Sequence, residues 1–117
     1  MHKILLVDDE YGIQAILDTL LSDAGYRTVL AGNGKQAVEL FRTERPDLVL
    51  MDWMMPIMDG PTAARLMQAQ RPEVPLIIMS GAHPQALREE YDGFTAFIAK
   101  PFRAATVLEA IDRALRG

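Results

Sequence analysis

The sequence contains no cysteine, which excludes disulfide bonds, thiolate metal sites and cysteine nucleophiles. Its two histidines, His2 and His83, are too few and too far apart to suggest a zinc site. It has no apolar run long enough to cross a membrane and no signal-peptide pattern at its start. The formal net charge of −4 argues against a nucleic-acid surface. We therefore expect a cytoplasmic protein that contacts neither nucleic acid directly nor a membrane.

What the sequence does contain is a regular alternation of short apolar runs and helical patterns along 117 residues, a length that fits one domain. The apolar runs predict strands over 3–7, 27–31, 48–51, 76–79 and 96–99, and the helical patterns cover 11–24, 34–43, 60–71, 84–91 and 103–116. Strands that alternate with helices across short connections predict an α/β fold, with a parallel sheet covered by helices on both faces. Runs such as ILLV and LVLM are apolar throughout, as strands buried on both faces require. In the first helix the stripe expected to face the core is Ile13, Ile16, Leu17, Leu20, Leu21 and Ala24.

Three carboxylates stand at the ends of two of these strands, Asp8 and Asp9 after the first and Asp52 after the third. In a doubly wound sheet of order 2-1-3-4-5, strands 1 and 3 flank the crevice at the carboxyl ends, so these acids should converge there. Two like charges about 4 Å apart repel by roughly 4 kcal/mol at an effective dielectric near 20, so such a site needs a cation. Hard oxygen ligands without imidazole or thiolate favour Mg²⁺ or a similar ion that keeps several waters.

Two further polar residues follow the remaining strands. Ser80 comes at the end of the fourth strand, and Lys100 follows the fifth. A hydroxyl and an ammonium group beside a magnesium site suit a phosphoryl group, whose charge is spread over three oxygens.

These residues carry a resemblance that covers the whole chain. The sequence resembles the receiver domains of two-component response regulators, of the kind found in chemotaxis regulators. The matching motifs are Asp8-Asp9, Asp52 with Pro56 and Asp59-Gly60 after it, Ser80-Gly81, Phe97, and Lys100-Pro101-Phe102. The resemblance implies one flavodoxin-like receiver domain over 1–117, a doubly wound sheet of five parallel strands in the order 2-1-3-4-5 with five helices, and no output domain in this chain.

The resemblance also implies the chemistry of the site. Asp52 would be the phosphoacceptor that attacks a phosphohistidine, a carboxylate nucleophile that forms an acyl phosphate. Asp8 and Asp9 would bind Mg²⁺ together with Asp52 and the backbone carbonyl of Met54, and Lys100 would pair with the phosphoryl oxygens. The chain would then be no enzyme in the ordinary sense, but a phosphoacceptor that assists its own phosphorylation and slow dephosphorylation.

Signalling would follow from a rearrangement near Ser80. Its hydroxyl would move toward the phosphoryl group and Phe97 would change rotamer, which alters the face made by helix 4, strand 5 and helix 5. The peptide bond between Lys100 and Pro101 would be cis. The implied partners are a sensor histidine kinase or phosphotransfer protein and a downstream effector protein, or an output domain missing from this chain.

Particular residues disfavour three alternative functions. A phosphatase of the haloacid dehalogenase type would place a second acid two residues after Asp52, where Met54 stands. A flavodoxin would need a phosphate loop rich in Ser, Thr and Gly after the first strand, where the acidic DDEYG stands. A receiver-like module that signals without phosphorylation is disfavoured by the intact acids and lysine. One departure concerns the stretch from Ser80 to Lys100: it spans twenty positions, slightly fewer than is common in the family, and the shortfall falls on helix 4.

Overall fold

The computed structural model describes residues 1–55 and 57–117. Within them, strands and helices alternate strictly, in the order β1 (Lys3–Val7), α1 (Tyr11–Asp23), β2 (Arg27–Ala31), α2 (Gly34–Glu44), β3 (Leu48–Asp52), α3 (Gly60–Gln70), β4 (Leu76–Ser80), α4 (Pro84–Glu90), β5 (Ala96–Ala99) and α5 (Ala104–Arg116). All strand pairs are parallel and the sheet has the order β2-β1-β3-β4-β5, as predicted. None of the described helices combines the length and hydropathy needed to span a bilayer.

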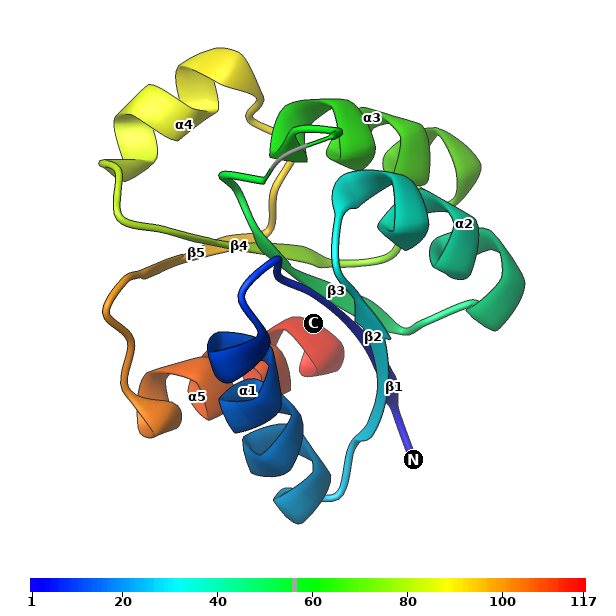
Figure 1. Ribbon diagram of the computed structural model, residues 1–117, viewed down its shortest axis with the longest axis vertical. Helices are drawn as coiled ribbons and strands as arrows, with labels where there is room; N and C mark the ends of the chain where they lie inside the picture. The colour runs from blue at the N-terminus through cyan, green and yellow to red at the C-terminus, as the bar shows by residue number, and fades with distance from the viewer. Residues whose placement is uncertain (56) are drawn as a thin grey trace.

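The sheet separates two layers of helices, with α1 and α5 on one face and α2, α3 and α4 on the other (Figure 1). Successive side chains of a strand point to opposite faces, so each central strand supplies both layers. On β1, for example, Ile4 and Leu6 pack toward α1 and α5, while Leu5 and Val7 join the opposite cluster. This explains why the central strands are apolar throughout. The edge strand β2 differs, because part of it is exposed.

Two of the helix starts near the carboxyl end of the sheet are fixed by side-chain caps. Asp59 accepts a hydrogen bond from the backbone N–H of Thr62 at 2.8 Å and opens α3. The exposed His83 accepts a hydrogen bond from the N–H of Gln85 at 3.2 Å through Nδ1 and opens α4. These caps set the two helices directly behind the loops that follow β3 and β4.

The predicted inward stripe of α1 is wrong at two positions. Ile16 is 58% exposed and Ala24 is exposed as well, while Gln14, a polar residue, is buried. The reason is a specific pair of acceptors. The Gln14 Nε2 group donates to the carbonyl oxygens of Ala31 at 3.1 Å and Asp8 at 3.4 Å, so α1 turns this polar side chain toward the sheet edge.

Strands β3 and β4 each run one residue further than predicted, so that Asp52 and Ser80 belong to the strands themselves. Parallel pairing continues to their ends, with Asp52 opposite Met79 and Ser80 opposite Ala99. Both polar groups are therefore held by sheet backbone rather than by flexible loops.

Candidate functional site

The three predicted acids meet at the carboxyl edge of the sheet. Asp8 and Asp9 follow β1, Asp52 ends β3, and β1 and β3 are neighbours. One carboxylate oxygen from each lies within 4.8 Å of the others. Asp8 is 1% and Asp52 is 6% exposed, whereas Asp9 is exposed. The parallel order of the strands thus brings residues 44 positions apart into one cluster.

Lys100 brings a positive charge to the same cluster. Its Nζ atom lies 3.4 Å from Oδ1 of Asp52 and 3.7 Å from Oδ2 of Asp8. The backbone N–H of Lys100 donates to the carbonyl of Ser80 at 3.0 Å, which fixes the start of this side chain at the end of β4. The peptide bond that follows, between Lys100 and Pro101, is cis.

Burial dominates the electrostatics of the two inner acids. It raises the pKa of Asp8 and the pKa of Asp52, because removal from water disfavours the charged carboxylate. The Lys100 ammonium opposes the rise in both pKa values. So do two backbone donors: the N–H of Glu10 to Oδ1 of Asp8 at 2.9 Å, and the N–H of Met54 to Oδ1 of Asp52 at 3.4 Å. The ionised cluster is therefore only partly compensated by the described residues.

The donor set of this cluster fits a hard divalent cation. Among the described residues no hydrogen bond reaches the buried Oδ2 atom of Asp8. Such an atom is costly unless something pairs with it, and the Lys100 ammonium at 3.7 Å is its charged neighbour. All the acidic donors are carboxylate oxygens, the ligands that Mg²⁺ prefers. The role expected for the Met54 carbonyl stays a prediction.

Ser80 and Phe97 lie on one face of the sheet. Ser80 is 2% exposed and its Oγ accepts the N–H of Ala82 at 3.0 Å. In the β4–β5 register Ile78 is opposite Phe97 and Ser80 opposite Ala99, so Ser80 and Phe97 are diagonal neighbours on the face that carries α4. Phe97 is half-buried against the cluster that contains Leu87 of α4.

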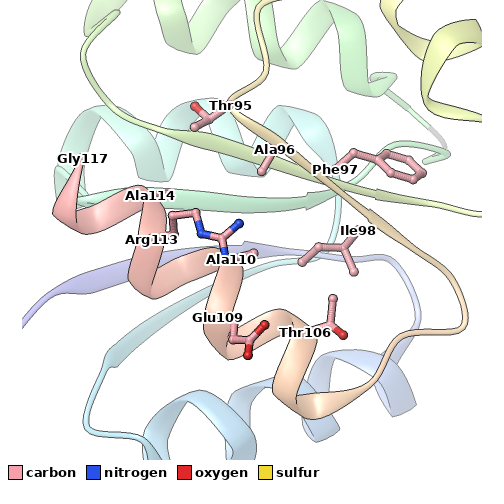
Figure 2. Close-up of a pocket in the computed structure, with 10 residues that line it drawn as sticks. All are labelled: Thr95, Ala96, Phe97, Ile98, Thr106, Glu109, Ala110, Arg113, Ala114 and Gly117. Carbon is pink, nitrogen blue, oxygen red and sulfur yellow. The ribbon is translucent and has the colours of Figure 1, made fainter.

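The other face of β5 belongs to α5. Figure 2 shows Ile98 directed toward α5 and Phe97 directed away from it. A pocket of about 460 Å³ lies between β5 and α5, with Glu109 and Arg113 of the helix among its lining residues. Strand β5 therefore directs Phe97 toward the face of the sheet that carries α4, and Ile98 toward α5.

An aromatic cluster lies beside Asp52. Trp53 directly follows the acid, is 2% exposed, and stacks on Tyr91 with ring centroids 6.3 Å apart. Phe94 meets the indole edge-on at 6.3 Å, and the Arg65 guanidinium lies 5.5 Å from the Tyr91 ring centre. Gly60 lets α3 approach, because a Cβ there would stand 2.5 Å from Cε3 of Trp53. The sequence contains no signal that Tyr91 and Phe94, which follow α4, would cover Trp53.

Apolar side chains surround the acidic crevice on two sides. On the side of α1 a groove of about 540 Å³ is lined by Glu10, Ile13, Ile16, Lys100, Pro101 and Phe102. On the other side, after β3, Met54 is 73% and Ile57 is 79% exposed, and Ile57 has a φ of 72°. Pro56, one of the residues that carry the resemblance, lies outside the described residues. We call these two sides, the groove together with Met54 and Ile57, the apolar rim.

Comparison with known proteins identifies the family. Residues 4–112 match the family described as the response regulator receiver domain. The chain is 36% identical over 116 residues to sporulation initiation phosphotransferase F of Bacillus subtilis, covering 97% of this chain and 94% of that protein. It is 38% identical over 117 residues to the chemotaxis protein CheY of the same organism, covering 97% and 98%. A probable transcriptional regulator, ycf27 of Porphyridium aerugineum, is 35% identical over 127 residues, which cover 97% of this chain but only 50% of that protein.

Solved structures show the same likeness. The receiver domain of the sensor histidine kinase PA1611 from Pseudomonas aeruginosa, which has a magnesium ion coordinated in its active-site cleft, superimposes with a TM-score of 0.91 at 32% identity and covers 99% of this chain and 98% of that one. The chemotaxis protein CheY4 of Vibrio cholerae gives a TM-score of 0.93 at 28% identity, covering 97% and 98%. The chain therefore belongs to the response regulator receiver domains, the phosphorylation-dependent signalling modules of two-component systems.

Proposed function

We propose that Asp52 is the phosphoacceptor of this receiver, that it takes its phosphoryl group from a phosphohistidine of a sensor histidine kinase or phosphotransfer protein, and that the modification controls a downstream effector or output domain. The observation that carries this proposal is the convergence of Lys100 with three carboxylates at one crevice, with Lys100 Nζ 3.4 Å from Oδ1 of Asp52. A carboxylate at a strand end, beside a fixed ammonium group, is arranged for nucleophilic attack on phosphorus.

In the proposed step a carboxylate oxygen of Asp52 attacks phosphorus, the phosphorus–nitrogen bond of the donor breaks, and the imidazole leaves with the bonding electron pair. Lys100 then pairs with the phosphoryl oxygens. Asp8, Asp9 and Asp52, with the Met54 carbonyl, would hold Mg²⁺, which when bound supplies positive charge to the carboxylates and phosphoryl oxygens. Since Asp52 is itself consumed and regenerated only by slow hydrolysis, we class the chain as a phosphoacceptor rather than an enzyme.

The switch that we propose uses Ser80 and Phe97. The Ser80 hydroxyl leaves its bond from the N–H of Ala82 and donates to a phosphoryl oxygen. Phe97 shares the face of β4 and β5 with Ser80, so it can turn inward as the hydroxyl moves. The half-buried ring supports this role, because it has both packed neighbours and open space. The face changed by this movement is that of α4, β5 and α5.

The apolar rim supports a protein donor rather than a small molecule alone. Ile16 is 58% exposed in a groove that also contains Lys100, and large exposed apolar side chains beside a charged site mark interaction surfaces. In this proposal the donor histidine approaches the crevice across this rim. We infer that the phosphodonor protein packs its apolar face against Ile13, Ile16 and Phe102.

The test is acetyl phosphate with Mg²⁺, followed by intact mass measurement and peptide mapping. We expect a single base-labile phosphoryl adduct on Asp52. It should be absent in Asp52→Asn and retained in Asp59→Asn, a matched change of an exposed carboxylate in the following loop. The same adduct in Asp52→Asn would sink the proposal.

A further inference from the structure

Met54 differs from the other methionines of the chain in its exposure and its position. Its side chain is 73% exposed, whereas Met51, Met67 and Met79 are buried. Met55 and Met58 are half-buried and pack against the core. Met1, at 88%, is similarly open but begins the chain. Met54 is thus the freely accessible thioether beside the proposed phosphoacceptor.

We propose that Met54 is a redox modification site: oxidation to the sulfoxide by hydrogen peroxide shortens the lifetime of the phosphoryl group on Asp52. This inference rests on the proposed function. In the reaction a sulfur lone pair attacks one peroxide oxygen, the oxygen–oxygen bond breaks, and the departing hydroxide takes up the proton of the transferred oxygen to become water. The sulfur is oxidised by two electrons and the peroxide is reduced by two. Methionine sulfoxide reductases reverse the change.

The position of Met54 explains why its oxidation state should matter. Its backbone N–H donates to Oδ1 of Asp52, so the residue is fixed directly beside the acceptor carboxylate. Hydrolysis of an aspartyl phosphate needs a water in line with the phosphoryl bond. The Met54 thioether is only a weak hydrogen-bond acceptor, so it cannot hold that water firmly.

Oxidation would change the hydrogen-bonding capacity of the Met54 side chain. It converts a flexible apolar side chain into a polar one with a strongly accepting oxygen. That oxygen can accept a hydrogen bond from the hydrolytic water and keep it near the phosphorus. One such bond to a neutral acceptor corresponds to a rate increase of about 2- to 10-fold. Oxidative conditions would thereby shorten the signal held by the receiver.

The experiment treats the whole protein with hydrogen peroxide and maps oxidation by peptide mass spectrometry before any phosphorylation. Met54 and Met1 should oxidise ahead of Met51, Met67 and Met79. Treated and untreated samples are then phosphorylated with acetyl phosphate and Mg²⁺, the donor is removed, and decay of the adduct is followed. We expect decay about 2- to 10-fold faster after oxidation, reversed by sulfoxide reductases. In Met54→Leu, which has no thioether at this position, peroxide should leave the decay of that variant unchanged.

Three results would overturn the inference: oxidation of Met54 no faster than that of the buried methionines, unchanged decay after Met54 is oxidised, or an equal effect of peroxide on Met54→Leu. The first readout does not depend on phosphorylation. If the untreated protein accepts no phosphoryl group at all, the proposed function fails and this inference fails with it. If it accepts the group and decays at the same rate when oxidised, the inference alone fails.

Discussion

The two faces of the sheet are built from different side chains. The buried cluster beneath α1 and α5 consists of aliphatic side chains and Met79, includes Val107 and Ile111 from α5, and has Tyr26 and Phe102 packed against it. The opposite cluster contains Phe41, Trp53 and Phe94, with Tyr91 and Phe97 packed against it. The helices differ as well: α5 has 13 residues, whereas α4 has seven and buries Leu87 alone.

This difference separates a fixed half from a half that can rearrange. Interdigitated aliphatic side chains have one good packing arrangement, and any movement opens a cavity. Around α4, by contrast, ring stacking and cation–ring contacts take the place of a helix interface, as where the Arg88 guanidinium lies 4.2 Å from the centre of the Phe94 ring. An element with few buried contacts is drawn from the low end of local stability. Ser80 and Phe97 lie on this second face, where a proposed movement is least costly.

The largest effect should come from opening a cavity on each face in turn. Ile111→Ala, in α5, should lower the free energy of unfolding by about 2–5 kcal/mol, because the surrounding aliphatic cluster cannot close around the missing atoms. Leu87→Ala, in α4, should cost clearly less, since a helix of seven residues can settle into the gap. Urea unfolding of the two variants and the wild type measures both losses of unfolding free energy.

The matched comparison also tests the idea of two halves. Leu87→Ala should speed amide hydrogen exchange in α4 while exchange in α5 stays as in the wild type. Equal losses of stability for the two variants, with exchange raised evenly over both faces, would show that the sheet has no fixed and movable side.

Much of the fold was accessible from the sequence because it depends on local patterns. The bounds of β1, β2 and β5 agree with the predicted runs, and strict alternation of strand and helix predicts a parallel sheet. The strand order was implied by the resemblance to receiver domains. The pattern failed at Gln14 and Ile16, where apolarity alone decided the prediction. Gln14 is buried because two backbone carbonyls from other segments accept its amide hydrogens, and such acceptors cannot be counted before the chain is folded.

The same distinction applies to the site. The proximity of Asp8, Asp52 and Lys100 could be predicted from the sequence, because strand ends in a parallel sheet share an edge. The packing of Tyr91 over Trp53 could not be predicted, because the path of the chain between α4 and β5 depends on tertiary packing. Backbone strain at Ile57 was equally hidden, because its residue type gives no sign of a positive φ.

An intermediate effect is expected from the acid cluster at the carboxyl edge of the sheet. Burial raises the pKa of Asp52 above its ordinary value of 3.8, so folding favours the protonated form. The metal-free wild type should therefore lose stability as the pH rises from that value through the raised pKa of the folded state. Asp52→Asn removes this charge and should raise metal-free stability near neutral pH by roughly 1–2 kcal/mol, since Lys100 offsets only part of the repulsion.

Asp59 provides the control of opposite sign. The backbone N–H of Thr62 donates to the Asp59 carboxylate and lowers the pKa of Asp59. The ionised Asp59 therefore stabilises the folded state above its ordinary pKa, and this stabilisation is lost as the pH falls through the lowered pKa. Asp59→Asn should thus not stabilise the protein at neutral pH. Thermal unfolding in EDTA across the acid-to-neutral range distinguishes the two. A gain for Asp52→Asn that stays constant through the titration range, or no gain at all, would contradict an uncompensated cluster.

The smallest effect should come from the strained position on the rim. Ile57 has a φ of 72° and is 79% exposed. A left-handed backbone costs about 1–2 kcal/mol for a residue with a Cβ, and a β-branched side chain tolerates it poorly, whereas Asn adopts it readily. Since little packing is lost at an exposed site, Ile57→Asn should raise the free energy of unfolding by about 0.5–1 kcal/mol in urea titrations.

Ile57→Val is the matched control, because it keeps β-branching and should give no gain. If the exposed isoleucine is kept for docking, Ile57→Asn should slow phosphotransfer from a phosphohistidine protein while leaving acetyl phosphate labelling of Asp52 unchanged, a trade of stability for binding. Equal stability of the Asn and Val variants would mean that the backbone at this position stores no strain. If stability rises without any loss of protein-dependent phosphotransfer, Ile57 does not belong to the docking surface, and only the groove beside α1 remains as that surface.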